Sequence, residues 1–216
     1  MIRSFLLIAA FLFLNSSVFS ESAWVFRKKI EGITIYTRPV PDTPYFEFRG
    51  ITRVKTSLFS ILALWADPDS YSEWMFNCKS ANLLKQETPL SLYTYIITAV
   101  PWPLVDRDNI LFAETYQDIN TGKINIKLTG KPEYLQKDKT MIRVSESHGI
   151  VELNPVENGE IEVVFEFFMN PAGEIPPALV NLTVLDFPYH TLKKMREVVK
   201  KPKFQNANYE FLKNSL

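Results

Sequence analysis

Hydrophobic and polar residues alternate along most of this chain, which is the pattern of strands that bury one face. In the clearest run, from Ile161 to Met169, the odd-numbered positions are apolar and Glu162 and Glu166 lie on the other face. The turn signals Asn120-Thr121-Gly122 and Glu157-Asn158-Gly159 separate neighbouring runs, so we expect a meandering antiparallel sheet. The pattern predicts its strands at 33–38, 46–54, 80–85, 92–100, 109–116, 123–128, 141–147, 150–153 and 161–169.

Helical spacing replaces this alternation in two regions. A Thr56-Ser57 cap followed by apolar residues between Leu58 and Trp65 predicts a helix that Asp67-Pro68 ends, and a short second helix is expected at 70–75. Near the C-terminus one apolar stripe predicts a long amphipathic helix; its members are Leu182, Leu185, Tyr189, Leu192, Met195 and Val199. Pro188 should kink this helix or make it start again, with Asp186 as the cap.

One antiparallel sheet followed by a long amphipathic helix predicts an α+β fold in which a curved sheet wraps around that helix. A charged and aromatic stretch between two of the predicted strands is more specific: Val100-Pro101-Trp102-Pro103-Leu104-Val105-Asp106-Arg107-Asp108. It resembles the strand junction of START domains, the lipid-transfer modules related to the steroidogenic acute regulatory protein. Two further segments agree at the right distances, Ile142 to Pro155 and Gly173 to Asn181. The resemblance covers residues 24–200 and implies the helix-grip topology.

The N-terminus is typical of an exported protein. Arg3 precedes the apolar run Phe5 to Leu14, and Ser20 completes a signal-peptide pattern with cleavage before Glu21. A run this short favours a cleaved signal over an anchor, since crossing a bilayer takes about 20 apolar residues. We therefore predict a signal peptide at 1–20, a START-like lipid-binding domain at 21–202 and a C-terminal tail at 203–216. With Cys78 as the single cysteine, no internal disulfide can form, which suits a bacterial periplasmic or secreted protein.

Composition argues against several classes of function. The chain carries 24 basic and 24 acidic residues, so it has no broad positive surface for nucleic acid. Its seven glycines are scattered, and its two histidines do not stand at metal-ligand spacing, so we predict no cofactor, no metal and no catalytic residue. Asp106, Arg107 and Asp108 alternate between the two faces of an extended chain, which favours structural ion pairs over shared acid–base chemistry.

The resemblance also identifies a candidate cavity between sheet and helix. Steroid-binding START domains place a buried acid and a buried arginine there, whereas an ungapped alignment through Arg107-Asp108 puts Thr94 and Ala113 at those positions. An apolar lining without that pair favours a ligand that is mainly hydrocarbon, because a charged headgroup would be buried without a partner. The alternative is a solid core. The predicted ligand-binding residues are Thr94, Ile96, Thr98, Leu111, Ala113, Phe165, Phe167, Val184 and Leu185.

Basic residues gather near the end of the C-terminal helix, at Lys193, Lys194, Lys200 and Lys201 among others, with Glu197 opposing them. They complement the helix dipole and offer a surface for an anionic membrane. The alternative is an ordinary solvated helix end.

The sequence therefore predicts a lipid-binding or lipid-transfer protein rather than an enzyme. Two alternatives stay open. Helix-grip proteins include polyketide cyclases and aromatases, and an enzyme of that kind needs titratable groups in the cavity. An interaction or sensor module would have a cavity filled by bulky side chains.

Overall fold

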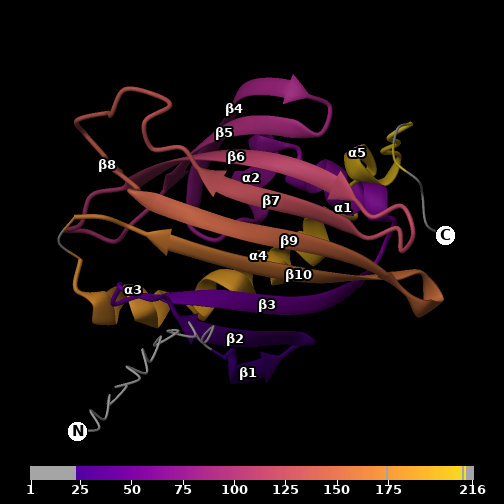
Figure 1. Cartoon of the computed structure of the whole chain (residues 1–216), viewed down its shortest axis with the longest axis horizontal. Coiled ribbons are helices and arrows are strands. Elements are labelled where there is room, and N and C mark those ends of the chain that lie inside the picture. The colour runs from indigo at the N-terminus through magenta and orange to yellow at the C-terminus, as the bar shows by residue number, and fades with distance from the viewer. Residues whose placement is uncertain (1–22, 174, 211, 213–216) are drawn as a thin grey trace, which may run out of the picture.

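The computed structural model describes residues 23–173, 175–210 and 212. A ten-stranded sheet curves around the helices, with its strands in the order β1-β2-β3-β10-β9-β7-β6-β5-β4 and β8 attached to β6 (Figure 1). Neighbours on the main path run antiparallel, while β8 pairs with β6 in parallel. The strands are β1 (Val25–Ile30), β2 (Ile33–Pro39), β3 (Phe46–Lys55), β4 (Cys78–Thr88), β5 (Ser91–Thr98), β6 (Arg107–Gln117), β7 (Ile124–Gly130), β8 (Ile142–Arg143), β9 (Glu146–Val156) and β10 (Glu160–Asn170).

The helices gather on one side of the sheet (Figure 1). The first, α1 (Leu58–Trp65), begins where the Ser57 side chain accepts a hydrogen bond from the Ser60 backbone N–H at 3.0 Å, as the sequence predicted. The remaining helical segments are η1 (Pro68–Ser70), α2 (Tyr71–Trp74), the 3-10 turn η2 (Glu157–Gly159), α3 (Pro177–Thr183), α4 (Asp186–Val198) and α5 (Pro202–Gln205). The curved sheet and the C-terminal helix α4 make the helix-grip fold that the sequence predicted.

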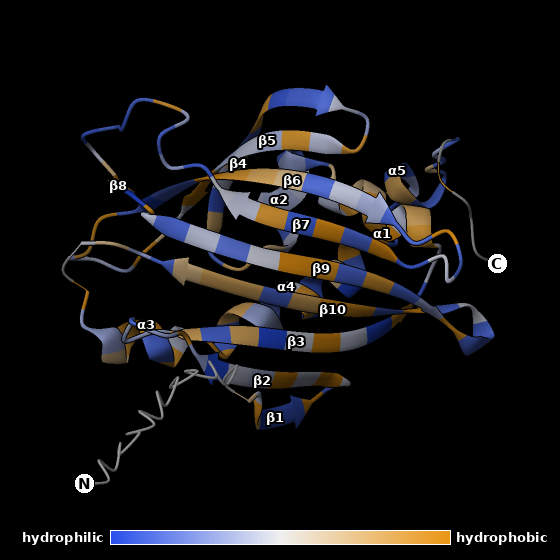
Figure 2. Ribbon diagram, in the orientation of Figure 1, coloured by the Kyte–Doolittle hydropathy of each residue, from blue (hydrophilic) through white to orange (hydrophobic). Residues whose placement is uncertain are grey.

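Alternation along the strands directs the apolar side chains onto the helices. In β10, Ile161, Val163, Phe165 and Phe167 are buried, while Glu162 and Glu166 are partly exposed on the outer face. Figure 2 shows the resulting bands of hydrophobic and polar residues along β9 and β10. On the helix side, Leu192 and Met195 of α4 are completely buried against this face. The pattern of period two was therefore a correct guide to the core.

Two glycines allow close approaches that shape this interior. A Cβ atom at Gly50 of β3 would lie 2.8 Å from Leu192 Cδ1, so α4 rests directly on that strand. A Cβ atom at Gly149 of β9 would lie 2.3 Å from the Glu166 carbonyl oxygen and 2.6 Å from Phe167 Cδ2. Glycine at 149 thus gives the Phe167 ring the space in which it lies.

The edges of the sheet differ from the sequence prediction. The sequence did not predict β1, because this edge strand is exposed along most of its length and shows no alternation. At the other edge, β4 is longer than expected and its register with β5 shifts at three places. The predicted strand 141–147 is two strands, since β8 follows β6 for two residues and the chain then turns at Val144 and Ser145 into β9.

The C-terminal helix is also interrupted earlier than predicted. It breaks between Thr183 and Asp186, so Pro188 sits in the first turn of α4, where its missing N–H has no helical partner to lose. Leu185 occupies the cap position, and Asp186 is instead the first helical residue, 3.7 Å from the Lys28 ammonium. Leu182, expected in the buried stripe, is 69% exposed.

Residues 203–210 pack against the domain. Phe204 of α5 is buried, and the Tyr209 ring meets Phe59 of α1 with centroids 5.5 Å apart. The Gln205 side-chain amide donates to the Val199 carbonyl oxygen at 2.6 Å. The described part of the predicted tail therefore packs against α1 and the end of α4.

Candidate functional site

A largely apolar cavity of about 110 Å³ lies between the inner face of the sheet and the helices. A water molecule needs roughly 10–15 Å³ of such space, so the interior is not solid at this point. Its walls come from β3, β5, β6, β7 and β10 on one side and from α1, α2, α3 and α4 on the other. The lining residues are Phe46, Phe48, Trp65, Tyr71, Met75, Thr94, Ile96, Thr98, Asn109, Leu111, Ala113, Leu128, Phe165, Phe167, Met169, Val180, Thr183, Val184 and Phe187.

Eight of the nine predicted ligand-binding residues line this cavity, and only Leu185 does not. Leu185 packs instead against the hydrophobic core at the start of α4. The register of β5 with β6 aligns the five on those strands, and β7 and β9 link them to Phe165 and Phe167 on β10. Val184 comes from the end of α3. Whether any of them contacts a ligand remains a prediction.

The sequence analysis predicted Phe165 and Phe167 but missed the other aromatic residues of the wall, Phe46, Phe48, Trp65, Tyr71 and Phe187. Phe48 meets Phe165 at a centroid distance of 5.1 Å and Phe187 at 5.7 Å, and Trp65 meets Phe165 at 5.0 Å. These rings come from β3, α1, α4 and β10, and only packing could join them. Phe46 and Phe48 alternate with Glu47, so the sequence predicts that the two rings share one face of the strand. It does not predict that this face points to the cavity.

Two polar side chains in the cavity wall are almost fully buried. Asn109 of β6 is 6% exposed, and its side-chain carbonyl oxygen accepts a hydrogen bond from the Ser147 hydroxyl at 3.1 Å. Thr94 of β5 is 2% exposed. Asn109 stands at the same alternate spacing as the predicted residues Leu111 and Ala113, and this parity could have identified it.

Tyr71 is the titratable side chain among the described lining residues. Its hydroxyl donates to the Trp65 backbone carbonyl oxygen, and burial raises the pKa of the phenol well above its usual range. The phenol therefore keeps its proton at neutral pH and has already used it in a hydrogen bond.

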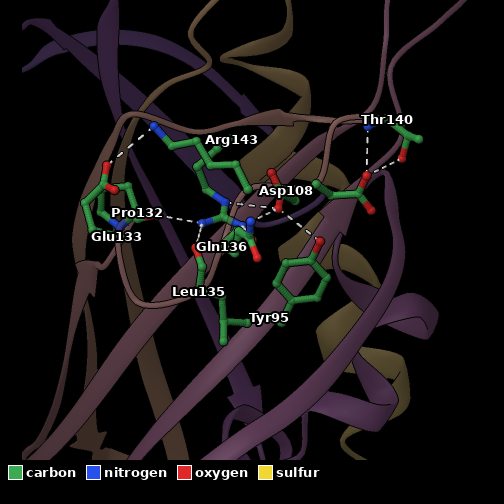
Figure 3. A network of polar contacts seen from close by, with 10 residues as sticks. Tyr95, Asp108, Pro132, Glu133, Leu135, Gln136, Thr140 and Arg143 are labelled. Atoms are coloured by element: carbon green, nitrogen blue, oxygen red, sulfur yellow. Dashed lines mark hydrogen bonds and ion pairs between the residues drawn. The ribbon is translucent and has the colours of Figure 1, made fainter.

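Asp108, in the charged stretch that carried the resemblance, lies on the face of β6 opposite to the cavity residues Asn109 and Leu111. Asp108 pairs with Arg143 at 2.8 Å and accepts a hydrogen bond from the Tyr95 hydroxyl at 3.0 Å (Figure 3). The pKa of Tyr95 is raised to about 12, mainly because the phenol is buried and secondly because it donates a hydrogen bond to Asp108. Arg143 also donates to the carbonyl oxygens of Pro132 and Leu135, so it ties the 131–140 loop to the sheet (Figure 3).

The expected ion pairs form for two of the three charges. Asp106 pairs with Lys79 at 2.8 Å, and this hydrogen bond lowers the pKa of the Asp106 carboxyl. Arg107 differs: its guanidinium donates to the carbonyl oxygens of Val105, Pro171 and Ala172, which joins β6 to the segment that leads into α3. Trp102, in the loop before β6, is 92% exposed and does not line the cavity.

Acids accompany most of the basic residues at the end of α4. Lys193 pairs with Glu31 and Lys194 with Glu197, at 2.8 Å and 3.1 Å. Lys201 pairs with Glu73, and Lys203 lies 2.7 Å from Asp67. Much of the positive charge that the sequence suggested is thus balanced locally.

A metal site, a reactive thiol and a membrane-spanning helix each place requirements on the described residues. They contain no group of histidine, cysteine and acidic side chains that could hold a metal ion. Cys78 is partly buried, and burial raises the pKa of its thiol to about 11. No helix within the described ranges is both long and apolar enough to cross a bilayer. The predicted signal peptide, residues 1–20, lies outside these ranges.

Known proteins resemble this chain over most of its length, although no protein-family model matches it. An uncharacterized protein of Pseudomonas aeruginosa is 32% identical over 178 residues, which cover 82% of this chain and 87% of that protein. The crystal structure of a STAR-related lipid transfer protein from Xanthomonas axonopodis, fragment 25–204, is 30% identical with a TM-score of 0.77. That match covers 82% of this chain and 99% of the other.

The fold also extends to a distant relative. Human StAR-related lipid transfer protein 5 is 16% identical, with a TM-score of 0.71 over 82% of this chain and 86% of that one. At this identity the likeness concerns the fold alone.

Proposed function

Because the chain belongs to the family of StAR-related lipid-transfer (START) proteins, we propose that it binds a lipid or another mainly apolar small molecule in the cavity under α3 and α4 and carries it through water. The observation that carries this proposal is the composition of the cavity wall. The described lining residues are aromatic and aliphatic apart from the neutral side chains of Thr94, Thr98, Asn109 and Thr183 and the Tyr71 hydroxyl.

The physical basis is the removal of hydrocarbon from water. Each buried methylene group contributes about 0.8 kcal/mol, so a buried chain of ten carbons contributes about 8 kcal/mol before the cost of association, without any ionic contact. A charged group in the same space would lose its hydration and find no opposite charge among the described lining residues. We propose that Ile96, Leu111, Phe165 and Phe167 contact the hydrocarbon.

Catalysis of the cyclase type is the alternative that this site supports less well. Such a reaction needs a proton donor or acceptor beside the substrate. Among the described lining residues, Tyr71 is the candidate for this proton donor or acceptor. Its raised pKa and its hydrogen bond to the Trp65 carbonyl oxygen keep its proton in place. Carriage requires no such group.

We also propose where carriage takes place. The signal pattern at 1–20 supports export, and the mature protein should then begin at or near Glu21. Sequencing the N-terminus of the protein recovered from the periplasm or the medium tests this. Full-length chain found only in the cytosol would overturn it.

A membrane is the proposed donor or acceptor of the ligand. Lys193, Lys194, Lys200 and Lys201 offer the contact surface, and attraction of exposed lysines to anionic lipid supports it. The local ion pairs reduce the net charge of this surface, so we expect the contact to be weak and sensitive to salt.

Filling the cavity tests the main proposal. In Ala113→Trp the indole would occupy the cavity from β6, whereas Ala66→Trp, at the exposed end of α1, is the matched control. We expect organic extracts of the purified parent and of Ala66→Trp to contain a bound lipid by mass spectrometry, and those of Ala113→Trp to lack it. A parent protein that neither co-purifies with an apolar molecule nor takes one up from solution would contradict the proposal.

A further inference from the structure

Asn109 places a carboxamide in a wall that is otherwise almost entirely apolar. It lies opposite Ile96 in the antiparallel register of β5 and β6, on the face that also carries Leu111 and Ala113. A polar group in such a place costs free energy unless it is hydrogen-bonded. The Asn109 carboxamide, buried among hydrocarbon side chains, therefore needs a hydrogen-bond partner.

The Asn109 side chain has one such partner among the described residues. The Ser147 hydroxyl donates to Asn109 Oδ1 at 3.1 Å, and both residues are buried. Gly130 makes this contact possible, because a Cβ atom there would lie 2.6 Å from the Ser147 hydroxyl oxygen and 2.8 Å from its carbonyl oxygen. The end of the neighbouring strand β7 thus leaves space for Ser147 to hydrogen-bond the carboxamide.

The other half of the carboxamide has no partner among the described residues. Asn109 Nδ2 makes no hydrogen bond to them, and the side chain borders the cavity. Thr94 repeats the arrangement. It lies on β5 opposite Leu111, two residues from Ile96, which is opposite Asn109. It borders the same cavity, and its hydroxyl makes no hydrogen bond within the described part of the chain. Two buried polar groups on adjacent strands thus face one space.

The chemistry of these groups limits what can meet them. An amide N–H and a hydroxyl donate to an oxygen, and the hydroxyl also accepts. Both are neutral, so they do not compensate the burial of a phosphate, a carboxylate or an ammonium group. Because the Ser147 hydroxyl can either donate or accept, it can hold the carboxamide in either orientation, and a ligand hydroxyl then satisfies whichever end remains.

We propose that Asn109 and Thr94 form a polar anchor that selects an uncharged lipid carrying a hydroxyl or carbonyl oxygen, with Ser147 as the positioning residue. The inference rests on the proposed function and names the ligand class for that cavity. The hydrocarbon part of the ligand lies along Phe165 and Phe167, and its oxygen lies in the cavity beside Asn109 and Thr94.

Displacement of a neutral reporter, Nile red, by three compounds of equal chain length tests the anchor: dodecan-1-ol, dodecane and dodecanoate at pH 8. Asn109→Leu keeps the side-chain size and removes the hydrogen bond. A neutral hydrogen bond corresponds to about a three- to tenfold change in affinity, so we expect dodecanol to bind that much more weakly to Asn109→Leu. Dodecane should bind parent and variant within about twofold, and dodecanoate should compete with the parent less well than dodecanol.

Further variants separate an anchor from an effect on folding. Thr94→Val preserves shape while removing the hydroxyl and should weaken dodecanol alone, and Ser147→Ala should have a smaller effect in the same direction. Asn125→Leu is the control, since Asn125 lies in β7 outside the cavity lining and should change none of the affinities. Thermal melting of each variant monitors the fold.

The outcomes distinguish this inference from the function beneath it. Equal losses for dodecanol and dodecane in both Asn109→Leu and Thr94→Val, or no loss for dodecanol in either, would overturn the anchor. Dodecanoate that binds as tightly as dodecanol would overturn the selection for uncharged ligands. If none of the three compounds displaces the reporter from the parent, the proposed function itself fails and the anchor fails with it.

Discussion

Arg143 meets Asp108 through two nitrogens that converge on one oxygen: Nη2 lies 2.8 Å and Nε 3.0 Å from Asp108 Oδ2. The Tyr95 hydroxyl donates to the same oxygen. The side chains of the pair are only 3% and 1% exposed. Asp108 belongs to the stretch from which the resemblance to START domains was read, and its pair Arg143 holds the 131–140 loop through the carbonyl oxygens of Pro132 and Leu135.

Removing the anion from this pair should be costly. In Asp108→Asn the Arg143 guanidinium stays buried without a counter-charge, so we expect a loss of about 3–5 kcal/mol in the free energy of unfolding, measured in urea. Lys79→Gln is the comparison, because Lys79 is mostly exposed in its pair with Asp106, and its loss should cost about 1 kcal/mol or less. Similar costs for the two variants would contradict a structural role for the buried pair.

Gly149 should not tolerate a side chain. In Gly149→Ala the new methyl group meets the Glu166 carbonyl oxygen at 2.3 Å, and backbone atoms of β10 cannot move aside without breaking the ladder. We expect a cost of about 3 kcal/mol or more, at or above the usual range for overpacking. Gly159→Ala is the control: it has φ of +68° but nothing within 4 Å, so only backbone strain of about 1 kcal/mol is expected. Thermal melting ranks the two.

Alkylation should show the raised pKa of Cys78. Burial raises this pKa from 9.0 to about 11, so at pH 8 only about one thiol in a thousand is ionised. Iodoacetamide should react slowly with the folded protein, and the rate should rise about tenfold per pH unit up to pH 10. Urea-unfolded protein should react as an ordinary thiol does. Fast reaction of the folded protein at pH 8 would exclude the buried thiol.

The same shift affects stability with a definite sign. Because the folded pKa is the higher one, the folded state holds the thiol proton more tightly. This contribution is fully present below pH 9 and decreases as the pH rises toward 11.

Helix α3 should open more readily than α4. It has no fully buried residue, whereas α4 buries Leu192 and Met195 completely. We expect α3 amides to exchange with deuterium at least about a hundredfold faster than the central amides of α4, since local opening spans a wide range of free energies. The boundary should fall at Val184 and Leu185, where the helix breaks, and not at Pro188. Uniform protection across 177–198 would contradict an independent α3.

The membrane proposal predicts slower lipid transfer when Lys193, Lys194, Lys200 and Lys201 are all changed to glutamine. Between anionic vesicles at low salt we expect a decrease of about three- to tenfold, which shrinks at higher salt, with equilibrium binding of the ligand unchanged. A second quadruple variant, Lys85, Lys123, Lys127 and Lys137 to glutamine, is matched in charge. Three of these lysines are also ion-paired, with Glu87, Glu152 and Glu133, so both variants lose three ion pairs. Equal slowing by both sets would show an effect of net charge alone.

The sheet side of the candidate site was predictable because strands have a strict period of two. Once Phe165 and Phe167 are assigned to one face, their neighbours on that face follow, and the same parity gives Ile96 and Leu111. The helix side was not predictable in this way. Trp65 and Tyr71 reach the cavity through the packing of α1 and α2, which no local pattern encodes.

Long-range ion pairs were equally inaccessible to the sequence. Lys201 and Glu73 are 128 residues apart, and Lys193 meets Glu31 across the fold. A count of lysines near the helix end therefore overestimated the charge of that surface. The break in the C-terminal helix was placed late because Pro188 is the visible signal, although a proline is tolerated in the first helical turn.

The irregular register of β4 has a consequence for how these molecules meet one another. An edge strand presents unpaired N–H and C=O groups that can recruit a strand from a second chain. Three register shifts interrupt the straight row of such groups along β4, and Lys79 and Lys85 place charge beside it. Two molecules that collide at this edge find no continuous ladder to extend, so the eleven-residue strand is a poor starting point for aggregation.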